Sequence, residues 1–180
     1  MRAEDVDSEI DRVLITEEQI LERLAQLAEQ VQADYPPEDD LLLVGVLKGA
    51  MMVMADFTRL LTRHASIDWM AVSSYGAGKR SSGVVRILKD LDVEIEGRHV
   101  LIVEDVLDSG LTLRWLIRSL ATRNPASVEI LTLLRKPEAI TNEIPVKYVG
   151  FDIENEFVVG YGMDVDERFR NLRCIATLPQ

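Results

Sequence analysis

The chain contains a single cysteine, which excludes an internal disulfide and suits a protein of a reducing compartment. That residue, Cys174, lies in the apolar segment CIATL, which favours a small buried side chain over a catalytic nucleophile. Histidine is also scarce, because only His64 and His99 are present, and their spacing supports no Ser-His-Asp triad. We therefore expect a cytoplasmic protein whose chemistry depends on neither a thiol nor an imidazole.

Long hydrophobic runs and an excess of positive charge are missing as well. No apolar run approaches the roughly 18 residues needed to span a membrane, and the acidic start MRAEDVDSEIDR lacks the pattern of a secretory signal. The 20 Lys and Arg residues are outnumbered by 31 Asp and Glu residues, so the formal net charge is −11. That charge argues against a nucleic-acid surface but allows a small anion held by a few local cations or a metal ion. We expect neither nucleic acid nor membrane among the partners.

The remaining composition, 47% hydrophobic and 28% charged over 180 residues, is that of one globular domain. A capping box at Thr16–Gln19 and the helical spacing after it predict a helix to about Asp34. Further helices are predicted at 50–61 and 113–123, and strands at 41–47, 67–75, 84–91, 99–106, 127–136, 147–153, 157–161 and near Cys174. The alternation of strands and helices predicts an α/β fold with a mostly parallel sheet, whose ligands bind beyond the carboxyl ends of the strands.

The segment VLIVEDVLDSGLTL, 100–113, combines a buried strand with a turn of small polar residues. Backbone N–H groups at the start of the next helix, the hydroxyls of Ser109 and Thr112, and a glycine at 110 would suit a phosphate. The alternative is a plain helix cap at Asp108 or Ser109, with Glu104 and Asp105 in solvent. Neither a Walker loop nor a dinucleotide-binding GxGxxG pattern is present in the chain.

Taken whole, VLIVEDVLDSGLT resembles the phosphoribosyl pyrophosphate motif of the type I phosphoribosyltransferases. The resemblance implies that the ribose 5-phosphate is held by Asp108, Ser109, Gly110, Leu111 and Thr112. It implies that Glu104 and Asp105 meet the ribose hydroxyls and Mg²⁺, for which carboxylate oxygens are suitable partners. Asp108 would also act as the catalytic general base toward N7 of a purine. Leu111 departs from the lysine that is common at this position in animal members.

Two more segments resemble the hypoxanthine-guanine members of this family. LKGA, 47–50, is similar to their pyrophosphate loop, which implies roles for Leu47, Lys48 and Gly49 and a cis peptide bond between Leu47 and Lys48. SSYGAGKRSSG resembles their flexible catalytic loop, with Ser74 and Tyr75 at its start and the mobile part at about 75–83. On their own, Lys48 would be an exposed strand end and the loop a mobile hairpin tip.

The last resemblance lies in LLRKP, 133–137, and in GFDIENEFVVGYGMDVDERFRNL, 150–172. It implies that Lys136 donates to the purine 6-oxo group, that Phe157 stacks on the base, and that Val158 reads the base edge. The other implied roles belong to Met163 beside the base, Asp164 as a ligand of a second Mg²⁺, and Arg170 on pyrophosphate. The plainer interpretation makes Phe157 and Val158 strand core and 164–167 a solvated acidic turn. Val165 stands where an aromatic residue is usual.

The resemblance covers about 13–177 and implies a type I phosphoribosyltransferase fold in one domain, 1–180, with a small hood from about 1–15 and 137–180. It implies purine salvage, in which Mg²⁺-dependent transfer from phosphoribosyl pyrophosphate to hypoxanthine or guanine gives IMP or GMP plus pyrophosphate, and a homo-dimer or homo-tetramer. Three alternatives stay open: preference for xanthine, a nucleotide-sensing regulator that binds RNA, and a flavodoxin-like binding domain without catalysis.

Overall fold

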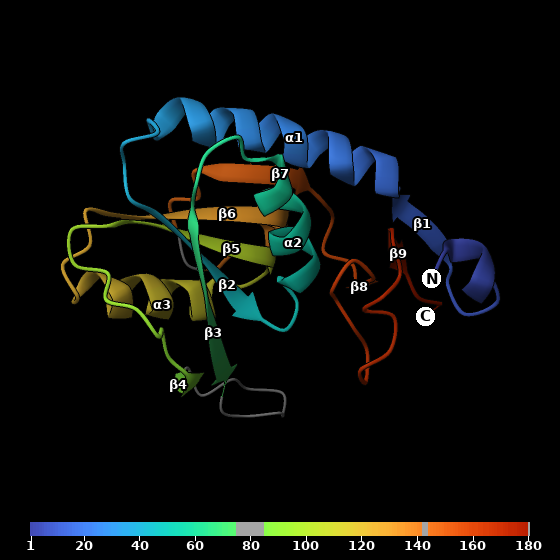
Figure 1. Cartoon of the computed structure of the whole chain (residues 1–180). Coiled ribbons are helices and arrows are strands. Elements are labelled where there is room, and N and C mark those ends of the chain that lie inside the picture. The colour runs from blue at the N-terminus through green and yellow to red at the C-terminus, as the bar shows by residue number, and fades with distance from the viewer. Residues whose placement is uncertain (75–84, 142–143, 180) are drawn as a thin grey trace.

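The protein is described here as a computed structural model that covers residues 1–74, 85–141 and 144–179. Its main sheet has the order β4-β3-β2-β5-β6-β7 (Figure 1). The strands are β2 (Leu41–Leu47), β3 (Ser66–Ser74), β4 (Val85–Lys89), β5 (His99–Leu107), β6 (Ser127–Arg135) and β7 (Tyr148–Asp152). All neighbours pair in parallel except β3 and β4, so the prediction of a mostly parallel sheet is confirmed.

Helices cover both faces of this sheet. The capping box begins α1 (Glu17–Asp34) as predicted, since Gln19 N donates to Thr16 Oγ1 and Thr16 N donates to Gln19 Oε1. Alternate residues of β2 point to opposite faces, which is the period of a strand buried on both sides. Leu41 and Leu43 pack with α1 and α2 (Met51–Leu60), whereas the intervening strand residues pack with α3 (Leu111–Ala121).

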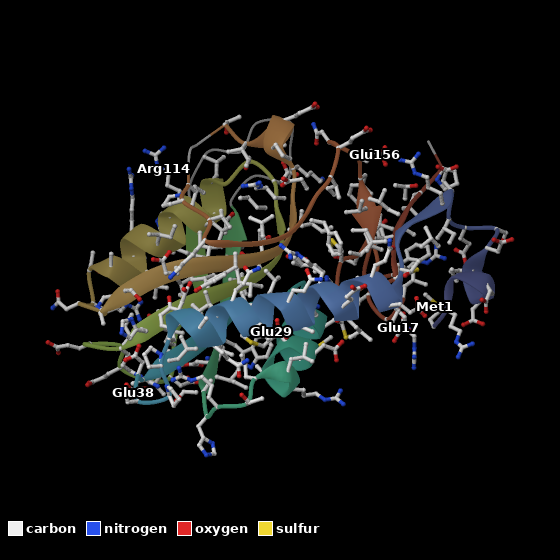
Figure 2. The ribbon with its side chains drawn as sticks, turned by 90° about the horizontal axis from the view of Figure 1, so that it is seen from above. Met1, Glu17, Glu29, Glu38, Arg114 and Glu156 are labelled. Carbon is white, nitrogen blue, oxygen red and sulfur yellow. The ribbon has the colours of Figure 1, made fainter. Side chains whose placement is uncertain are left out.

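A second, three-stranded antiparallel sheet joins the two ends of the chain. Its order is β1 (Arg12–Ile15), β9 (Ile175–Thr177) and β8 (Val158–Val159), and the short helices η1 (Ala3–Val6) and η2 (Pro137–Ala139) complete the described elements. An ion pair of Arg12 with Glu156 links β1 to the segment before β8, and one of Arg173 with Glu17 links the segment before β9 to the start of α1. Figure 2 shows Met1, Glu17 and Glu156 at one end of the molecule, with Glu38 at the other.

The parallel strands set up the site. β2, β5 and β6 are consecutive in the sheet and end at the same edge, so the residues directly after them, Lys48, Asp108 and Lys136, are brought to one side of the molecule. This is where ligands bind in open α/β sheets. Among the described residues, no helix is both long and apolar enough to cross a membrane.

Candidate active site

The predicted site residues gather around two hollows at the edge of the sheet. The first, about 230 Å³, lies over the ends of β5 and β6. It is lined by Asp105, Val106, Asp108, Lys136, Phe157, Val158, Met163 and Asp164. All seven predicted residues in this set come from segments far apart in the sequence, so the fold brings them together as expected.

Lys136 and Asp108 form the polar pair of this hollow. Lys136 is 7% exposed, its backbone N–H donates to Leu107 O over 3.0 Å, and its Nζ lies 3.6 Å from Asp108 Oδ2. Phe157 is 59% exposed beside the hollow, so the interpretation of this ring as strand core is wrong. Val158 is buried in β8, and Met163 is also buried. An exposed aromatic ring, an amine donor and a carboxylate acceptor therefore surround one space.

The second hollow, about 100 Å³, is the turn from β5 into α3. It is lined by Glu104, Val106, Leu107, Asp108, Ser109, Gly110, Leu111, Thr112 and Leu113. Gly110 has φ +80, a left-handed conformation that suits glycine, and α3 begins at the next residue. The first backbone N–H groups of the helix thus open onto this hollow, which favours an anion. All five residues predicted for the 5-phosphate line it.

Two carboxyl groups adjacent in the sequence line these hollows, Asp105 the first and Glu104 the second. Glu104 is 7% exposed, so the alternative in which it stands in solvent is wrong. Burial raises the pKa of Glu104 well above its ordinary value, and the neighbouring Asp105 adds to the shift. Burial also raises the pKa of Asp105, against a hydrogen bond from Val106 N and the charge of Arg170. Burial thus disfavours the ionised form of both groups, whereas a nearby cation favours it.

The predicted pyrophosphate loop lies against Asp105. The peptide bond between Leu47 and Lys48 is cis, as the resemblance implied. A Cβ atom on Gly49 would lie 1.9 Å from Asp105 Oδ2, and a Cβ atom on Gly162 would lie 2.0 Å from Gly49 O. Gly162 also has φ +103. Three segments of the chain therefore approach one another here more closely than side chains would allow.

Lys48 and Arg170, the two predicted pyrophosphate cations, meet on one carboxylate. Lys48 Nζ lies 2.9 Å from Glu167 Oε1, and Arg170 Nε donates to Glu167 Oε2 over 3.1 Å. Arg170 Nη2 also lies 2.8 Å from Asp164 Oδ1. The hydrogen bonds from Arg170 and then Lys48 lower the pKa of Glu167 to about 2. Two acids of the turn, Asp164 and Glu167, are thus paired with cations, although Glu167 and its neighbour Asp166 stay exposed.

The family resemblance implies that Glu104, Asp105 and Asp164 are metal ligands. In the described part of the chain no three His, Cys, Asp or Glu side chains converge as a complete metal cluster. Mg²⁺ usually takes one or two carboxylates and completes its shell with water and substrate phosphates. Asp105 and Asp164 are half-buried carboxylates that both interact with the charge of Arg170. Their oxygens are ligands of the type that Mg²⁺ prefers.

Other hollows lack this chemistry. One of about 330 Å³ lies among Arg12, Phe151 and Glu154, and one of about 430 Å³ lies among Asp11, Asn155 and Phe157. Of the predicted site residues only Phe157 lines either of them. We place the site at the smaller hollows because the strand ends, the helix start and the titratable groups converge there.

Some of the predicted residues cannot be placed. Ser74 is the last residue of β3 and pairs with Val85, but Tyr75 and the loop 75–83 lie outside the described residues.

Sequence reasoning also missed residues that shape the site, namely Glu167, Gly162 and the pair of Tyr161 and Asp56. Tyr161 Oη donates to Asp56 Oδ2 over 2.5 Å and ties the loop of Gly162 to α2, a link with no short-range signal in the sequence.

Comparison with known proteins identifies the family of the chain. The phosphoribosyl transferase domain model matches residues 14–166, and the chain belongs to that family. Within it, the chain is 55% identical to a hypoxanthine-guanine phosphoribosyltransferase of Mycobacterium tuberculosis, over 98% of this chain and 90% of that one.

Solved structures agree with this. A hypoxanthine phosphoribosyltransferase of Staphylococcus aureus superposes with a TM-score of 0.93 at 44% identity, over 97% of this chain and 95% of that one. A Trypanosoma cruzi hypoxanthine phosphoribosyl transferase, studied for the role of its C-terminal region in oligomeric state and activity, gives 0.89 at 40%, over 95% and 92%. The type I phosphoribosyltransferase fold is thereby confirmed.

Proposed function

We propose that the chain is a purine-salvage enzyme that transfers ribose 5-phosphate from phosphoribosyl pyrophosphate to hypoxanthine or guanine. The products are IMP or GMP and pyrophosphate. The observation that carries the proposal is the convergence of Lys136 and Asp108 in one hollow beside the helix start of α3. The similarity to hypoxanthine-guanine phosphoribosyltransferases supports the same reaction.

The phosphate end of the substrate would lie in the turn before α3. Backbone N–H groups of the turn and the hydroxyls of Ser109 and Thr112 supply donors for the 5-phosphate. Leu111 lines the same hollow, and because its side chain has no hydrogen-bond donor it would contribute through its backbone. Glu104 and Asp105, at the end of β5, would then face the ribose.

The base would lie in the hollow of Lys136. The amine of Lys136 would donate to the 6-oxo group, and the exposed ring of Phe157 would stack on the purine. Val158 would read the base edge through its backbone, with Met163 beside the base. A 6-amino group would place a donor against the Lys136 donor, so adenine should be rejected.

In the reaction, the bond from C1′ of ribose to N9 of the purine forms while the bond from C1′ to the pyrophosphate oxygen breaks. Pyrophosphate leaves with that electron pair, and Asp108 accepts the proton from N7 of the purine. Positive charge develops on the ribose ring between these events. The carboxylates of Glu104 and Asp105 would stabilise charge that exists only in the transition state.

Lys48, Gly49 and Arg170 would hold the leaving group, with the backbone at Leu47 shaping the loop. Asp105 and Asp164 fit Mg²⁺ by ligand type, and Glu104 would support the shell. When bound, Mg²⁺ would supply charge neutralisation at the pyrophosphate oxygens. The roles of Ser74 and Tyr75 in a loop that closes over the reaction remain part of the same proposal.

The test is nucleotide formation from phosphoribosyl pyrophosphate and hypoxanthine, followed by the absorbance change of the base and by released pyrophosphate. We expect one pyrophosphate per nucleotide, and loss of product when Mg²⁺ is chelated and its recovery when Mg²⁺ is returned. Equal product with and without chelator would contradict the metal requirement. No product under any of these conditions would contradict the proposed reaction.

We also propose that the protein is cytoplasmic and forms a homo-dimer or homo-tetramer, with a hood made by about 1–15 and 137–180. The single cysteine and the likeness to the Trypanosoma cruzi protein support this. Light scattering coupled to gel filtration tests the assembly. A mass close to the 20.3 kDa of one chain at micromolar concentration would contradict it.

A further inference from the structure

Glu167 forms ion pairs with both cations that the proposed reaction assigns to pyrophosphate. Its two carboxylate oxygens divide between them, because Oε1 lies 2.9 Å from Lys48 Nζ and Oε2 accepts from Arg170 Nε over 3.1 Å. Lys48 follows β2, whereas Arg170 lies far along the chain beyond β8. A single carboxylate thus bridges two cations from separate segments, as one phosphate group of a diphosphate would.

The turn holds Glu167 in this place. Its backbone N–H donates to Asp164 Oδ2 over 2.8 Å, and its φ of +63 turns the side chain back toward Arg170. Arg170 is fixed from the other side, since its Nη1 donates to Gly162 O over 2.8 Å. Lys48 and Glu167 are each 63% exposed, so solvent and a competing anion can reach their ion pair.

We propose that Glu167 is a positioning residue that competes with the diphosphate for Lys48 and Arg170. The carboxylate keeps the two cations in place while the site is free, and it must be displaced before pyrophosphate or the diphosphate of phosphoribosyl pyrophosphate can bind. Glu167 therefore weakens the binding of pyrophosphate and of phosphoribosyl pyrophosphate, and it favours release of pyrophosphate after the transfer. The inference rests on the proposed function, because that function assigns the two cations to pyrophosphate.

The test compares Glu167→Gln with Asp166→Asn. Each substitution removes one negative charge from the same exposed turn. Among the ion pairs of the described residues, however, Glu167 is the one acid that engages both Lys48 and Arg170. Asn suits position 166, where φ is +50. Titration calorimetry with sodium pyrophosphate at fixed Mg²⁺ gives the affinity for each protein, with thermal unfolding as a check of folding.

We expect Glu167→Gln to bind pyrophosphate about three- to fivefold more tightly than wild type, the range of an exposed ion pair. Asp166→Asn should change the affinity less than twofold, since only long-range charge is altered. In steady-state kinetics the KM for phosphoribosyl pyrophosphate should fall in Glu167→Gln while the KM for hypoxanthine stays the same. A merely structural role of the turn would not separate the two KM values.

Equal affinities in the two variants, or weaker binding in Glu167→Gln, would overturn the inference. So would the absence of pyrophosphate binding to both wild type and Glu167→Gln. The proposed function has a separate readout, which is nucleotide formation by the wild type. Tighter pyrophosphate binding in Glu167→Gln without any wild-type turnover would support this inference and contradict the proposed function. Wild-type turnover without tighter binding in Glu167→Gln would support the proposed function and contradict this inference.

Discussion

Lys136 Nζ lies 3.6 Å from Asp108 Oδ2, although the two residues follow different strands of the sheet. Asp108 comes directly after β5 and Lys136 directly after β6, and these strands are parallel neighbours. Their shared edge therefore places an amine donor and a carboxylate acceptor in one hollow. A 6-oxopurine carries its hydrogen-bond-accepting 6-oxo group and its N7 side by side on one edge, so it fits that pair.

The role of Asp108 as general base predicts a loss of rate rather than of binding. Asp108→Asn should lower kcat by about 10² to 10⁴, the usual contribution of proton transfer to a side chain. The affinity for IMP, measured by titration calorimetry, should change little because the backbone donors of the turn remain. Asp166→Asn serves as the matched control. Turnover of Asp108→Asn at the wild-type rate would refute the assignment.

The role of Lys136 concerns the choice of base. Lys136→Met should lower kcat/KM for hypoxanthine by about 10- to 100-fold, since a hydrogen bond from a charged donor is worth about 1.5–3 kcal/mol. Adenine loses no such bond, so the ratio of kcat/KM for hypoxanthine to that for adenine should fall. Lys147→Met, which removes a lysine paired with Asp34, is the control. An unchanged ratio in Lys136→Met would contradict the role of this amine.

The contact of Gly162 with Gly49 O predicts a specific effect of a methyl group. Gly162→Ala should lower the free energy of unfolding by about 1–3 kcal/mol, because the added atom would meet backbone at 2.0 Å, and it should raise the KM for phosphoribosyl pyrophosphate. Gly97→Ala shares a positive φ, +72, but has open space around its Cβ. Urea unfolding of the two variants separates contact from backbone strain. Equal losses would show that the approach to Gly49 does not matter.

The carboxylate of Asp34 predicts how stability depends on pH. Hydrogen bonds from Tyr148 Oη, over 2.7 Å, and from Lys147 lower the pKa of Asp34. A lowered pKa in the folded protein stabilises it above the ordinary value of about 3.9, and this stabilisation is lost as the pH falls through the folded pKa.

Asp34→Asn should therefore lower the free energy of unfolding at pH 7 by about 0.5–1.5 kcal/mol, toward the low end because the carboxylate is partly exposed. The difference from wild type should shrink as the pH falls below about 4. Urea unfolding at several pH values measures it, with Glu38→Gln as a control on an exposed acid. A difference that is constant from pH 7 to pH 3 would contradict the assignment.

Local signals were enough to predict much of the main sheet and its helices. The capping box at Thr16 and Gln19 begins α1 as predicted, and the apolar run after Arg98 forms β5. The turn before α3 and the cis bond before Lys48 are also found where the family resemblance placed them. The unusual residues at the strand ends pointed to one edge of the sheet, and the fold brings them together there.

Features that depend on distant parts of the chain could not be predicted. β1 is four residues long and pairs with β9 near the other end of the chain, so no local pattern reveals it. The antiparallel direction of β4 has no local signal either. From the sequence, Glu167 was interpreted as part of a solvated acidic turn, because the ion pair with Lys48 is formed only when the chain folds. Such contacts follow from the tertiary arrangement rather than from spacing.

The most direct test of the account is the rate of nucleotide formation from phosphoribosyl pyrophosphate with hypoxanthine, guanine, xanthine and adenine, compared as kcat/KM. The account predicts turnover of hypoxanthine or guanine. Adenine should be worse by about 10² or more, because the buried Lys136 donor would be left without an acceptor. Adenine turned over as readily as hypoxanthine would contradict the central claim that Lys136 and Asp108 select a 6-oxopurine.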